Sequence, residues 1–491
     1  LEARYGDIAA MNEAWGNVFW SQEYRSFEEI DLPNLTVTEP NPSHVLDFYR
    51  FSSDQVIGFN RQQTEIIRKY APGRDIIHNF MGFFFDFDHF ALAEDLDAVG
   101  WDSYPIGFLD VAPFPASDKE RYLRQGHPDI AAFHHDLYRA CGRGRWQVLE
   151  QQPGAVNWAP HNPAPLAGMV RLWSLEAFAH GGEAVNYFRW RQAPFAQEQM
   201  HAGLERPNGA AAPGIAEARE TATDLKALAL DKDSGGKARV ALLFSYEANW
   251  LFEAQPQGAE WSYPALVFEW YAGLRRLGLD IDIISPSAPL GGYALILVPS
   301  LPIVDEGFIE RLRETKAPVL FGPRSGSKTL SLSIPEALAP GLLQTLLPLN
   351  VIRSESFPDF YRVKGTLNNA PVEGRAWLDH VETDLAPLAR SDEGGLLYRN
   401  NNILYLTTVP EPLFLGGLLF SLAEEAGLAP VFLPEDLRRR RRGDTEFVFN
   451  YGPESNEILE NVAPEDASFI LGERQLPPAG VAAWKRNTKS H

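Results

Sequence analysis

The segment around which the chain is organised is Trp146-Gln-Val-Leu-Glu-Gln-Gln-Pro-Gly-Ala-Val-Asn-Trp158. It begins with a short apolar run, residues 146 to 149, which predicts a β-strand, and the Pro153-Gly154 pair ends that strand. Glu150 therefore lies at the carboxyl end of a strand. In a barrel of parallel strands, catalytic side chains lie at this place, where the loop to the next helix begins. The alternative is a surface glutamate that follows a strand.

The residues that follow Glu150 favour a ligand site over a bare surface position. Gln151 and Gln152 supply side-chain amides, which hydrogen-bond to hydroxyl groups. Trp158 supplies an indole, whose face packs against the C–H side of a pyranose ring. Amides and an aromatic face beside a carboxylate suit a sugar-binding site. Because Trp158 lies in a predicted loop, we expect it to line a cleft rather than a core.

The composition is typical of a globular protein whose acidic charge disfavours binding to polyanions. The 491 residues are 45% hydrophobic and 22% charged, which suits roughly two to four folded domains. The 12 tryptophans suit carbohydrate binding, although large cores also account for them. A net charge of −21 argues against binding to nucleic acid or to anionic membranes. The one basic run, residues 438 to 442, is expected to be a solvated or an interface segment.

The number of cysteines and the lengths of the apolar runs exclude several kinds of site and structure. Cys141 is the only cysteine, so the chain has no internal disulfide and no cysteine-based zinc site. No apolar run approaches the ~20 residues of a membrane-spanning helix. We therefore expect no membrane partner and a cytoplasmic location. The chain begins with Leu1 rather than Met, so the absence of a signal sequence says little about secretion.

Strands and helices alternate over the first half of the chain. Each predicted strand ends in polar or aromatic residues, which is typical of an α/β barrel whose site lies at the strand carboxyl ends. A closed barrel needs eight strands, and four precede the change in composition near residue 230. Strands are predicted at 75–80, 98–101, 146–149 and 184–190, and helices at 42–70 (with Ser43 as its cap), 128–141 and 167–180.

The second half predicts two further domains. Residues 231–237 form a polar, glycine-bearing linker. The alternation that follows predicts a doubly wound α/β domain as far as about residue 428, and short runs between Gly and Pro predict a small β domain after it. The expected division is 1–230, 237–430 and 431–491. The strands of the second domain are predicted at 240–244, 281–284, 294–298 and 318–321, and its helices at 264–277 and 306–314.

Several further stretches carry the pattern of one enzyme family. They are Ala14-Trp-Gly16 with Phe19-Trp-Ser-Gln22, Trp101-Asp-Ser-Tyr-Pro105, Gly168-Met-Val-Arg-Leu-Trp173, Glu176-Ala-Phe-Ala-His-Gly181, Tyr187-Phe-Arg-Trp-Arg-Gln192 and Phe321-Gly-Pro-Arg-Ser-Gly-Ser-Lys-Thr329. Together with the Glu150 segment, these motifs resemble glycoside hydrolase family 42, the β-galactosidases, over essentially the whole chain.

The resemblance implies a fold, a reaction and a site. The family fold is a (β/α)8 barrel, an amidotransferase-like α/β domain that forms trimers, and a small β domain. The implied reaction is retaining hydrolysis of terminal β-D-galactosyl residues by two glutamates, with Glu150 as nucleophile. A homotrimer through residues 237–430 is also implied. The positions that line the family's galactose subsite are Trp20, Tyr104, Trp158, Glu198 and His201.

For two of these positions, their spacing in the sequence also favours a shared binding role, independently of the family resemblance. Glu198 and His201 are three residues apart, which on a helical turn places both on one face, where they can hold neighbouring sugar hydroxyls. The alternative is an exposed helix start.

One part of the family pattern is missing. The family's acid/base glutamate belongs to an Asn-Glu pair at the end of the fourth barrel strand, which precedes the segment matched by Leu1. We therefore expect the C-terminal half of the barrel, without strands one to four, without the acid/base and without activity toward β-galactosides as the chain stands. Neither Asn12-Glu13 nor Asn456-Glu457 is suitably placed to replace it. No cofactor is expected, and structural zinc stays undecided.

Other functions remain to be weighed. The chain could be a non-catalytic carbohydrate-binding or assembly fragment, or a glycosidase of the same fold that acts on α-L-arabinopyranosides.

Three local motifs do not carry the function that they resemble. Residues 322–329 do not match the sequence of a phosphate-binding loop, because Ser327 replaces the required glycine and Pro323 lacks an N–H. Amidotransferase chemistry needs a cysteine, which the second domain lacks. His134 and His135 point about 100° apart on a helix, so a joint metal site is not expected.

Overall fold

The computed structural model describes residues 1–231 and 237–486. Most of the predicted linker, residues 232–236, lies outside the described residues. None of the described helices is long and apolar enough to cross a membrane.

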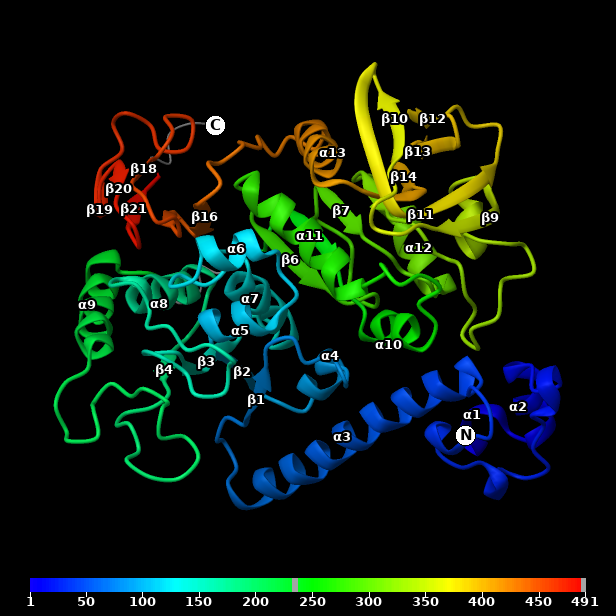
Figure 1. The fold of residues 1–491 in the computed structure, drawn as a ribbon, viewed down its shortest axis with the longest axis horizontal. Helices are drawn as coiled ribbons and strands as arrows, with labels where there is room; N and C mark the ends of the chain where they lie inside the picture. Colours follow the sequence, from blue (N-terminus) through cyan, green and yellow to red (C-terminus); the bar gives the residue numbers. More distant parts are fainter. Residues whose placement is uncertain (232–236, 487–491) are drawn as a thin grey trace.

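The first half of the chain forms a sheet of four parallel strands in the order β1-β2-β3-β4. All four overlap the predicted strands, so the prediction of four parallel strands in this half of the chain is confirmed. Among the described residues, β1 and β4 pair on one side only, and the sheet is open at both edges (Figure 1). The strands are β1 (Ile77–Met81), β2 (Ala98–Ser103), β3 (Trp146–Gln151) and β4 (Val185–Tyr187).

Helices pack around this sheet, and the longest is α3 (Pro42–Tyr70). Asn41 caps α3 by accepting a 2.8 Å hydrogen bond from the Ser43 amide, and Pro42 fits the first turn because its missing N–H is not needed there. The predicted cap at Ser43 is therefore wrong: its hydroxyl donates to the Ser331 carbonyl at 2.8 Å. The other helices of this half are α1 (Glu2–Tyr5), α2 (Ile8–Trp15), α4 (His89–Ala93), α5 (Pro105–Val111), α6 (Ala116–Arg121), α7 (Ile130–Cys141), α8 (Met169–Ala179) and α9 (Pro213–Leu228).

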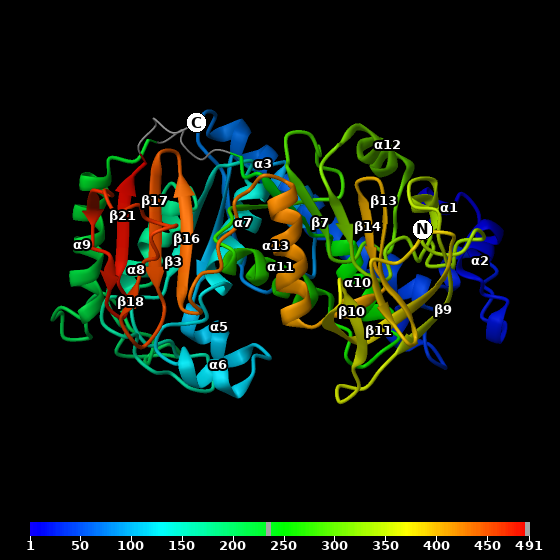
Figure 2. The ribbon, with the colours of Figure 1, turned by 90° about the horizontal axis from the view of Figure 1, so that it is seen from above.

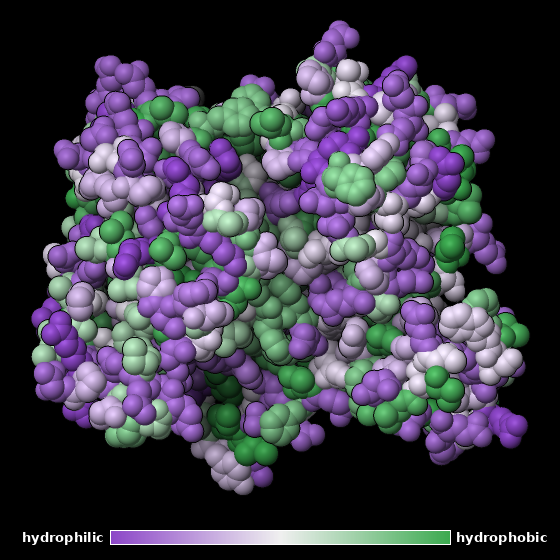
Figure 3. Space-filling model, viewed as in Figure 1, coloured by the Kyte–Doolittle hydropathy of each residue, from purple (hydrophilic) through white to green (hydrophobic). Residues whose placement is uncertain are grey.

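Apolar side chains remain exposed along α3. In Figure 3 they gather at the lower edge of the molecule, where α3 runs in Figure 1. Because contiguous apolar surface is uncommon on a protein that stands alone, this face is suited to packing against further protein. The exposed apolar residues of α3 are Phe51, Val56, Phe59, Ile66, Ile67 and Tyr70.

The second sheet has 11 strands, and only part of it was predicted. Strands β6, β5, β7, β8 and β14 are parallel neighbours, as in a doubly wound domain. Antiparallel strands then extend the sheet, and the sequence analysis missed them. The sequence feature that indicates these strands is the pair Asn368-Asn369. Both residues have positive φ, 51° and 66°, and form the tight turn of a β-hairpin.

The strands of this sheet are β5 (Val240–Leu243), β6 (Ile281–Ile284), β7 (Leu295–Val298), β8 (Val319–Phe321), β9 (Asn350–Ser356), β10 (Val363–Leu367), β11 (Ala370–Glu382), β12 (Ala389–Ser391), β13 (Gly394–Asn400), β14 (Ile403–Leu406) and β15 (Thr408–Pro410). The helices are α10 (Tyr246–Ala254), α11 (Tyr263–Arg276), α12 (Glu306–Glu314) and α13 (Pro412–Glu425).

A small antiparallel sheet closes the chain, and it contains the basic run. Residues 438–442 belong to its first strand, on which Arg438, Arg440 and Arg442 are buried. The solvated alternative for this run is therefore wrong, and the interface alternative holds. The strands are β16 (Leu437–Arg442), β17 (Thr445–Asn450), β21 (Val481–Lys485) and β19 (Phe469–Leu471), beside a separate pair, β18 (Asn456–Glu457) and β20 (Gln475–Leu476).

A buried ionic network joins the three sheets. Arg275 on α11 donates to Glu176 on α8 at 2.6 Å, and the Tyr451 hydroxyl donates to the same carboxylate at 2.5 Å. Arg438 on β16 donates two 2.7 Å hydrogen bonds to the carboxylate of Asp129. Figure 2 shows β16 between α8 and α11. Charges this deep are stabilising only when paired, so the network specifies how the sheets meet.

Candidate active site

The two faces of the first sheet carry different residues. Trp101 on β2 stacks on His134 of α7 with ring centroids 5.1 Å apart, so it faces the helices. Successive strand residues point to opposite faces, which turns Asp102 to the inner face. The strand pairing places Asp102 directly beside Glu150 of β3. Two carboxyl groups therefore neighbour one another at the carboxyl ends of the strands.

Tyr104 holds the carboxylate of Glu150. Its hydroxyl donates a 2.5 Å hydrogen bond to Glu150 Oε2. Burial and this bond raise the pKa of Tyr104, so the phenol stays protonated and remains a donor. A donor to the charged form of a carboxyl group favours ionisation and fixes its orientation. The geometry suits a carboxylate that must attack from one direction.

Asp102 is a second, different carboxyl group. It is 5% exposed, and Asn79 Nδ2 donates to its Oδ2 at 2.9 Å. Its Oδ1 is buried with no hydrogen-bond partner in the described part of the chain. Burial and the charge of Glu150 raise the pKa of Asp102 to about 7. Sequence reasoning quoted this residue in a motif but missed its role, because strand register is a tertiary property.

His201 and Trp158 gather around the ring of Tyr104. The Tyr104 ring lies edge-on to Trp158 at 5.7 Å and to His201 at 5.6 Å. Burial and the charge of Arg189 lower the pKa of His201 to about 4, so its imidazole is neutral near pH 7. Its Nδ1 bonds to Asn157 Oδ1 at 3.0 Å, and this fixes the tautomer with Nε2 as an acceptor. Trp158 is 43% exposed, as a platform for a ligand requires.

Glu198 lies on the same turn but in a different setting. The His201 amide donates to the Glu198 carbonyl at 3.0 Å, which makes a turn rather than a helix. His201 is buried, whereas the Glu198 side chain is half exposed and pairs with Arg189. The alternative of an exposed helix start is therefore wrong, while a shared role of Glu198 and His201 toward sugar hydroxyls stays a prediction. Arg189, whose guanidinium lies over the Phe188 ring, is a further residue of the candidate site, and sequence reasoning missed it.

The structure does not bring Trp20 to this cluster. Trp20 is 62% exposed, and its described ring contact is with Phe19 at 5.1 Å. Helix α2, which ends five residues before Trp20, lies on the opposite side of the molecule from β3 in both views (Figures 1 and 2). A role for Trp20 in the same subsite stays a prediction.

Metal ligands do not converge in the described residues. No group of three or more His, Cys, Asp or Glu side chains is placed there to hold an ion. The adjacent His134 and His135 are used separately: His134 Nε2 accepts from the Phe83 amide at 2.8 Å, and His135 Nδ1 accepts from Trp101 Nε1 at 3.2 Å.

Comparisons with known proteins agree on one family. A family model described as "Beta-galactosidase" matches residues 1–228, and one described as "Beta-galactosidase trimerisation domain" matches residues 238–429. A β-galactosidase of Thermus thermophilus is 59% identical over 488 residues, which span 99% of this chain and 75% of that protein.

Solved structures show the same likeness. The β-galactosidase of the psychrophilic Marinomonas ef1 is 45% identical with a TM-score of 0.96, over 99% of this chain and 75% of that one. The enzyme of the haloarchaeon Halorubrum lacusprofundi is 36% identical with a TM-score of 0.92, over 99% and 74%. With these matches and the carboxylate site at the end of β3, the chain belongs to glycoside hydrolase family 42, the β-galactosidases.

Proposed function

We propose that this chain serves β-galactoside hydrolysis by a retaining mechanism in which Glu150 is the nucleophile. The observation that carries the proposal is the carboxylate of Glu150 at the end of β3, bonded to Tyr104 at 2.5 Å and bordered by Trp158 and His201. An oriented, ionised carboxylate next to an aromatic platform is what attack on a sugar ring requires.

The proposed reaction has two displacements. Glu150 attacks the anomeric carbon, and its C–O bond forms as the bond to the aglycone breaks; a general acid gives the leaving oxygen its proton. Water, deprotonated by the same group, then hydrolyses the glycosyl ester and frees Glu150. In this scheme Trp158 carries the sugar ring, while His201 and the Glu198–Arg189 pair hold hydroxyl groups.

The acid/base role falls to a group other than Asp102. A retaining enzyme needs its second carboxyl group roughly 5–5.5 Å from the first, across the scissile bond. Asp102 lies beside Glu150 on the neighbouring strand and is 5% exposed, so it is shielded from a leaving group. We infer that it acts on the charge of Glu150 instead.

Covalent labelling tests the nucleophile without requiring the acid. A 2,4-dinitrophenyl 2-deoxy-2-fluoro-β-galactoside has a leaving group that needs no protonation, and its fluorine slows hydrolysis of the ester. We expect one label per chain, located by peptide mass mapping on Glu150, and no label in Glu150→Gln. The control Asp102→Asn should be labelled at the same residue. A label on another residue, or equal labelling of Glu150→Gln, would remove Glu150 from the mechanism.

We also propose a division into 1–230, 237–430 and 431–491, with a homotrimer formed through 237–430. The match of residues 238–429 to a trimerisation domain supports the assembly. Exposed apolar side chains in this region support it too, since buried interface cores are built from such residues. Leu413 at the start of α13 is 93% exposed, and Phe360 is 87% exposed.

A further inference from the structure

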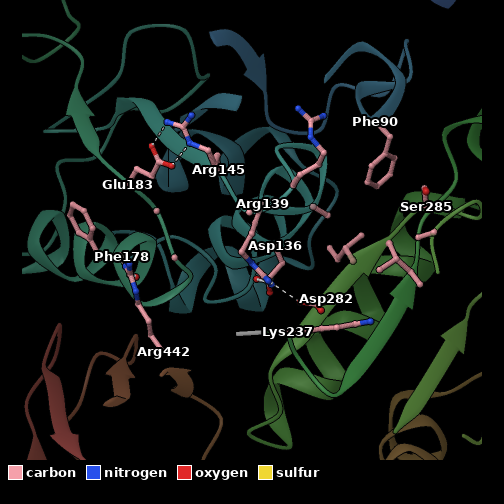
Figure 4. Close-up of a pocket in the computed structure, with 18 of the residues that line it drawn as sticks. Phe90, Asp136, Arg139, Arg145, Phe178, Glu183, Lys237, Asp282, Ser285 and Arg442 are labelled. Atoms are coloured by element: carbon pink, nitrogen blue, oxygen red, sulfur yellow. Dashed lines mark hydrogen bonds and ion pairs between the residues drawn. The ribbon is translucent and has the colours of Figure 1, made fainter. Parts of the chain in front are cut away.

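A large cavity lies between the first and second sheets, at the opposite end of β3 from Glu150. Its volume is about 1180 Å³, and Figure 4 shows its walls on α7, on β6 and on the loops that enter β3 and β4. Gly144 and Arg145 precede β3, whereas Glu150 is the second-last residue of that strand, so the cavity is separate from the proposed active site. Cavities of this size hold small-molecule ligands.

The cavity wall carries more cations than carboxylates, although the chain as a whole is strongly acidic. The carboxylates are Asp136, Glu183 and Asp282, and the cations are Arg139, Arg143, Arg145, Lys237 and Arg442.

Each of these carboxylates is already paired. Arg139 bridges Asp136 and Asp282 at 2.7 and 2.8 Å, and Arg145 pairs with Glu183 at 2.9 Å; Figure 4 shows both arrangements. Arg440, which does not line the cavity, adds a second positive charge beside Asp136 at 3.5 Å. Each carboxylate therefore has a cationic neighbour, and the excess charge on the wall is positive.

Two of the cations bond to neutral acceptors. Arg143 donates to the carbonyls of Ala93 at 2.9 Å and Leu96 at 2.7 Å. Lys237 donates to the Gly291 carbonyl at 2.6 Å, and its ammonium lies 3.8 Å from the Tyr293 ring centroid. A carbonyl satisfies a donor but leaves its charge uncompensated. Arg143 comes from the first half of the chain and Lys237 from the second, so both halves contribute positive charge to the cavity wall.

Behind the cavity, two N–H donors lack acceptors. Trp146 Nε1 and Arg139 Nε are buried with no hydrogen-bond partner in the described part of the chain. Both border Gly181, which lines the cavity: a Cβ there would lie 3.7 Å from Arg139 Cδ and 3.9 Å from Trp146 Nε1. An unpaired buried donor is destabilising, which is consistent with a hydrogen-bond acceptor from a ligand at this end of the cavity.

We propose that this cavity binds a small molecule bearing a phosphate group. Phosphate supplies several acceptor oxygens and the negative charge that Arg143 and Lys237 lack, and guanidinium groups match its geometry. Gly144, Gly181 and Gly182 leave room for the anion to approach the wall. Because the ligand contacts both halves of the chain, its binding stabilises their packing.

Calorimetry and thermal unfolding at constant ionic strength test the site, with inorganic phosphate and a hexose phosphate as probes. We expect saturable binding of at least one probe at millimolar concentration, with a matching rise in Tm. Arg143→Met and Lys237→Met should each weaken binding about tenfold, since each removes one charge-assisted contact.

The matched control is Arg145→Met combined with Glu183→Gln. It removes an ion pair from the same wall without changing the net charge. Arg145 also pairs with Asp75 at 2.8 Å, but that carboxylate is more than half exposed and screened by water, so the Kd should stay within twofold. Absence of saturable binding by both probes would overturn the proposal. An equal loss of affinity in the control would also overturn the proposal. It would show that the probes respond to the overall electrostatic potential of the wall and not to a specific binding site. Labelling at Glu150 is independent of either result.

Discussion

At the scale of single residues, Tyr104 and Asp102 act on Glu150 in opposite directions. The Tyr104 hydroxyl donates to the Glu150 carboxylate and stabilises its charge. Asp102, once ionised, would place a like charge beside it in a buried position. With a pKa of about 7, Asp102 changes charge within the range where the protein would work. A neutral Asp102 therefore places no like charge beside the carboxylate of Glu150.

Asp102→Asn tests this coupling through stability. Because burial and Glu150 raise the pKa of Asp102 from 3.8 to about 7, the folded state holds its proton longer than the unfolded state. The wild-type free energy of unfolding should therefore fall as pH rises from about 4 to 7. Asn cannot ionise and still accepts from Asn79, so the variant should gain on the order of 3 kcal/mol over wild type between pH 5 and pH 8.

Urea unfolding at both pH values measures this difference. The control is Asp97→Asn, since Asp97 is a carboxyl group at the other end of β2 that pairs with Arg68. Hydrogen bonds from the Ile76 amide and from Arg68 lower the pKa of Asp97, so its removal should not give the same gain. Parallel pH dependence of Asp102→Asn and wild type would show that Asp102 is not protonated in the folded protein.

At the scale of elements, the charged residues of α8, α11 and β16 decide how the sheets meet. Arg275 is 1% exposed and contacts both Glu176 and Asp129, while Arg438 completes the pairing of Asp129. Removing one partner from a buried pair leaves an uncompensated charge, which costs far more than an exposed pair contributes. The network is therefore stabilising only as a unit.

Arg275→Met keeps most of the side-chain volume and removes the charge. We expect the free energy of unfolding to fall by about 3–5 kcal/mol, measured by urea denaturation. Adding Glu176→Gln should recover part of the loss, since the unpaired carboxylate is then gone. Arg145→Met breaks a pair whose side chains are 46% exposed and should cost less than about 1 kcal/mol. Equal losses in Arg275→Met and Arg145→Met would contradict the buried network.

At the scale of the whole molecule, the second sheet is the proposed assembly surface. Leu413 and Phe360 lie within residues 237–430 and are almost wholly exposed. A charge introduced at an interface core opposes association because it must be desolvated. We expect Leu413→Asp with Phe360→Asp to sediment below the trimer mass of the parent chain. Phe59→Asp, on the exposed face of α3, should leave the trimer intact; if it dissociates the trimer instead, the contact lies on the first half.

The sequence by itself determined the local elements and one end of the site. Helix α12 (Glu306–Glu314) and strand β6 (Ile281–Ile284) were predicted to the residue, as were the ends of α3. Glu150 was placed at the end of a strand, which β3 bears out. These features depend on the period of apolar residues and on Pro and Gly within a few positions, so a single stretch carries the information.

Only the tertiary structure decided which distant residues meet. Asp102 became the neighbour of Glu150 through strand register, and no local pattern encodes the register between segments 48 residues apart. The basic run of β16 was buried because carboxylates from α7 and the preceding loop are there to pair with it. Long-range pairing depends on the three-dimensional arrangement of both partners, which is why the buried charges, the antiparallel half of the second sheet and the place of Trp20 were beyond the sequence.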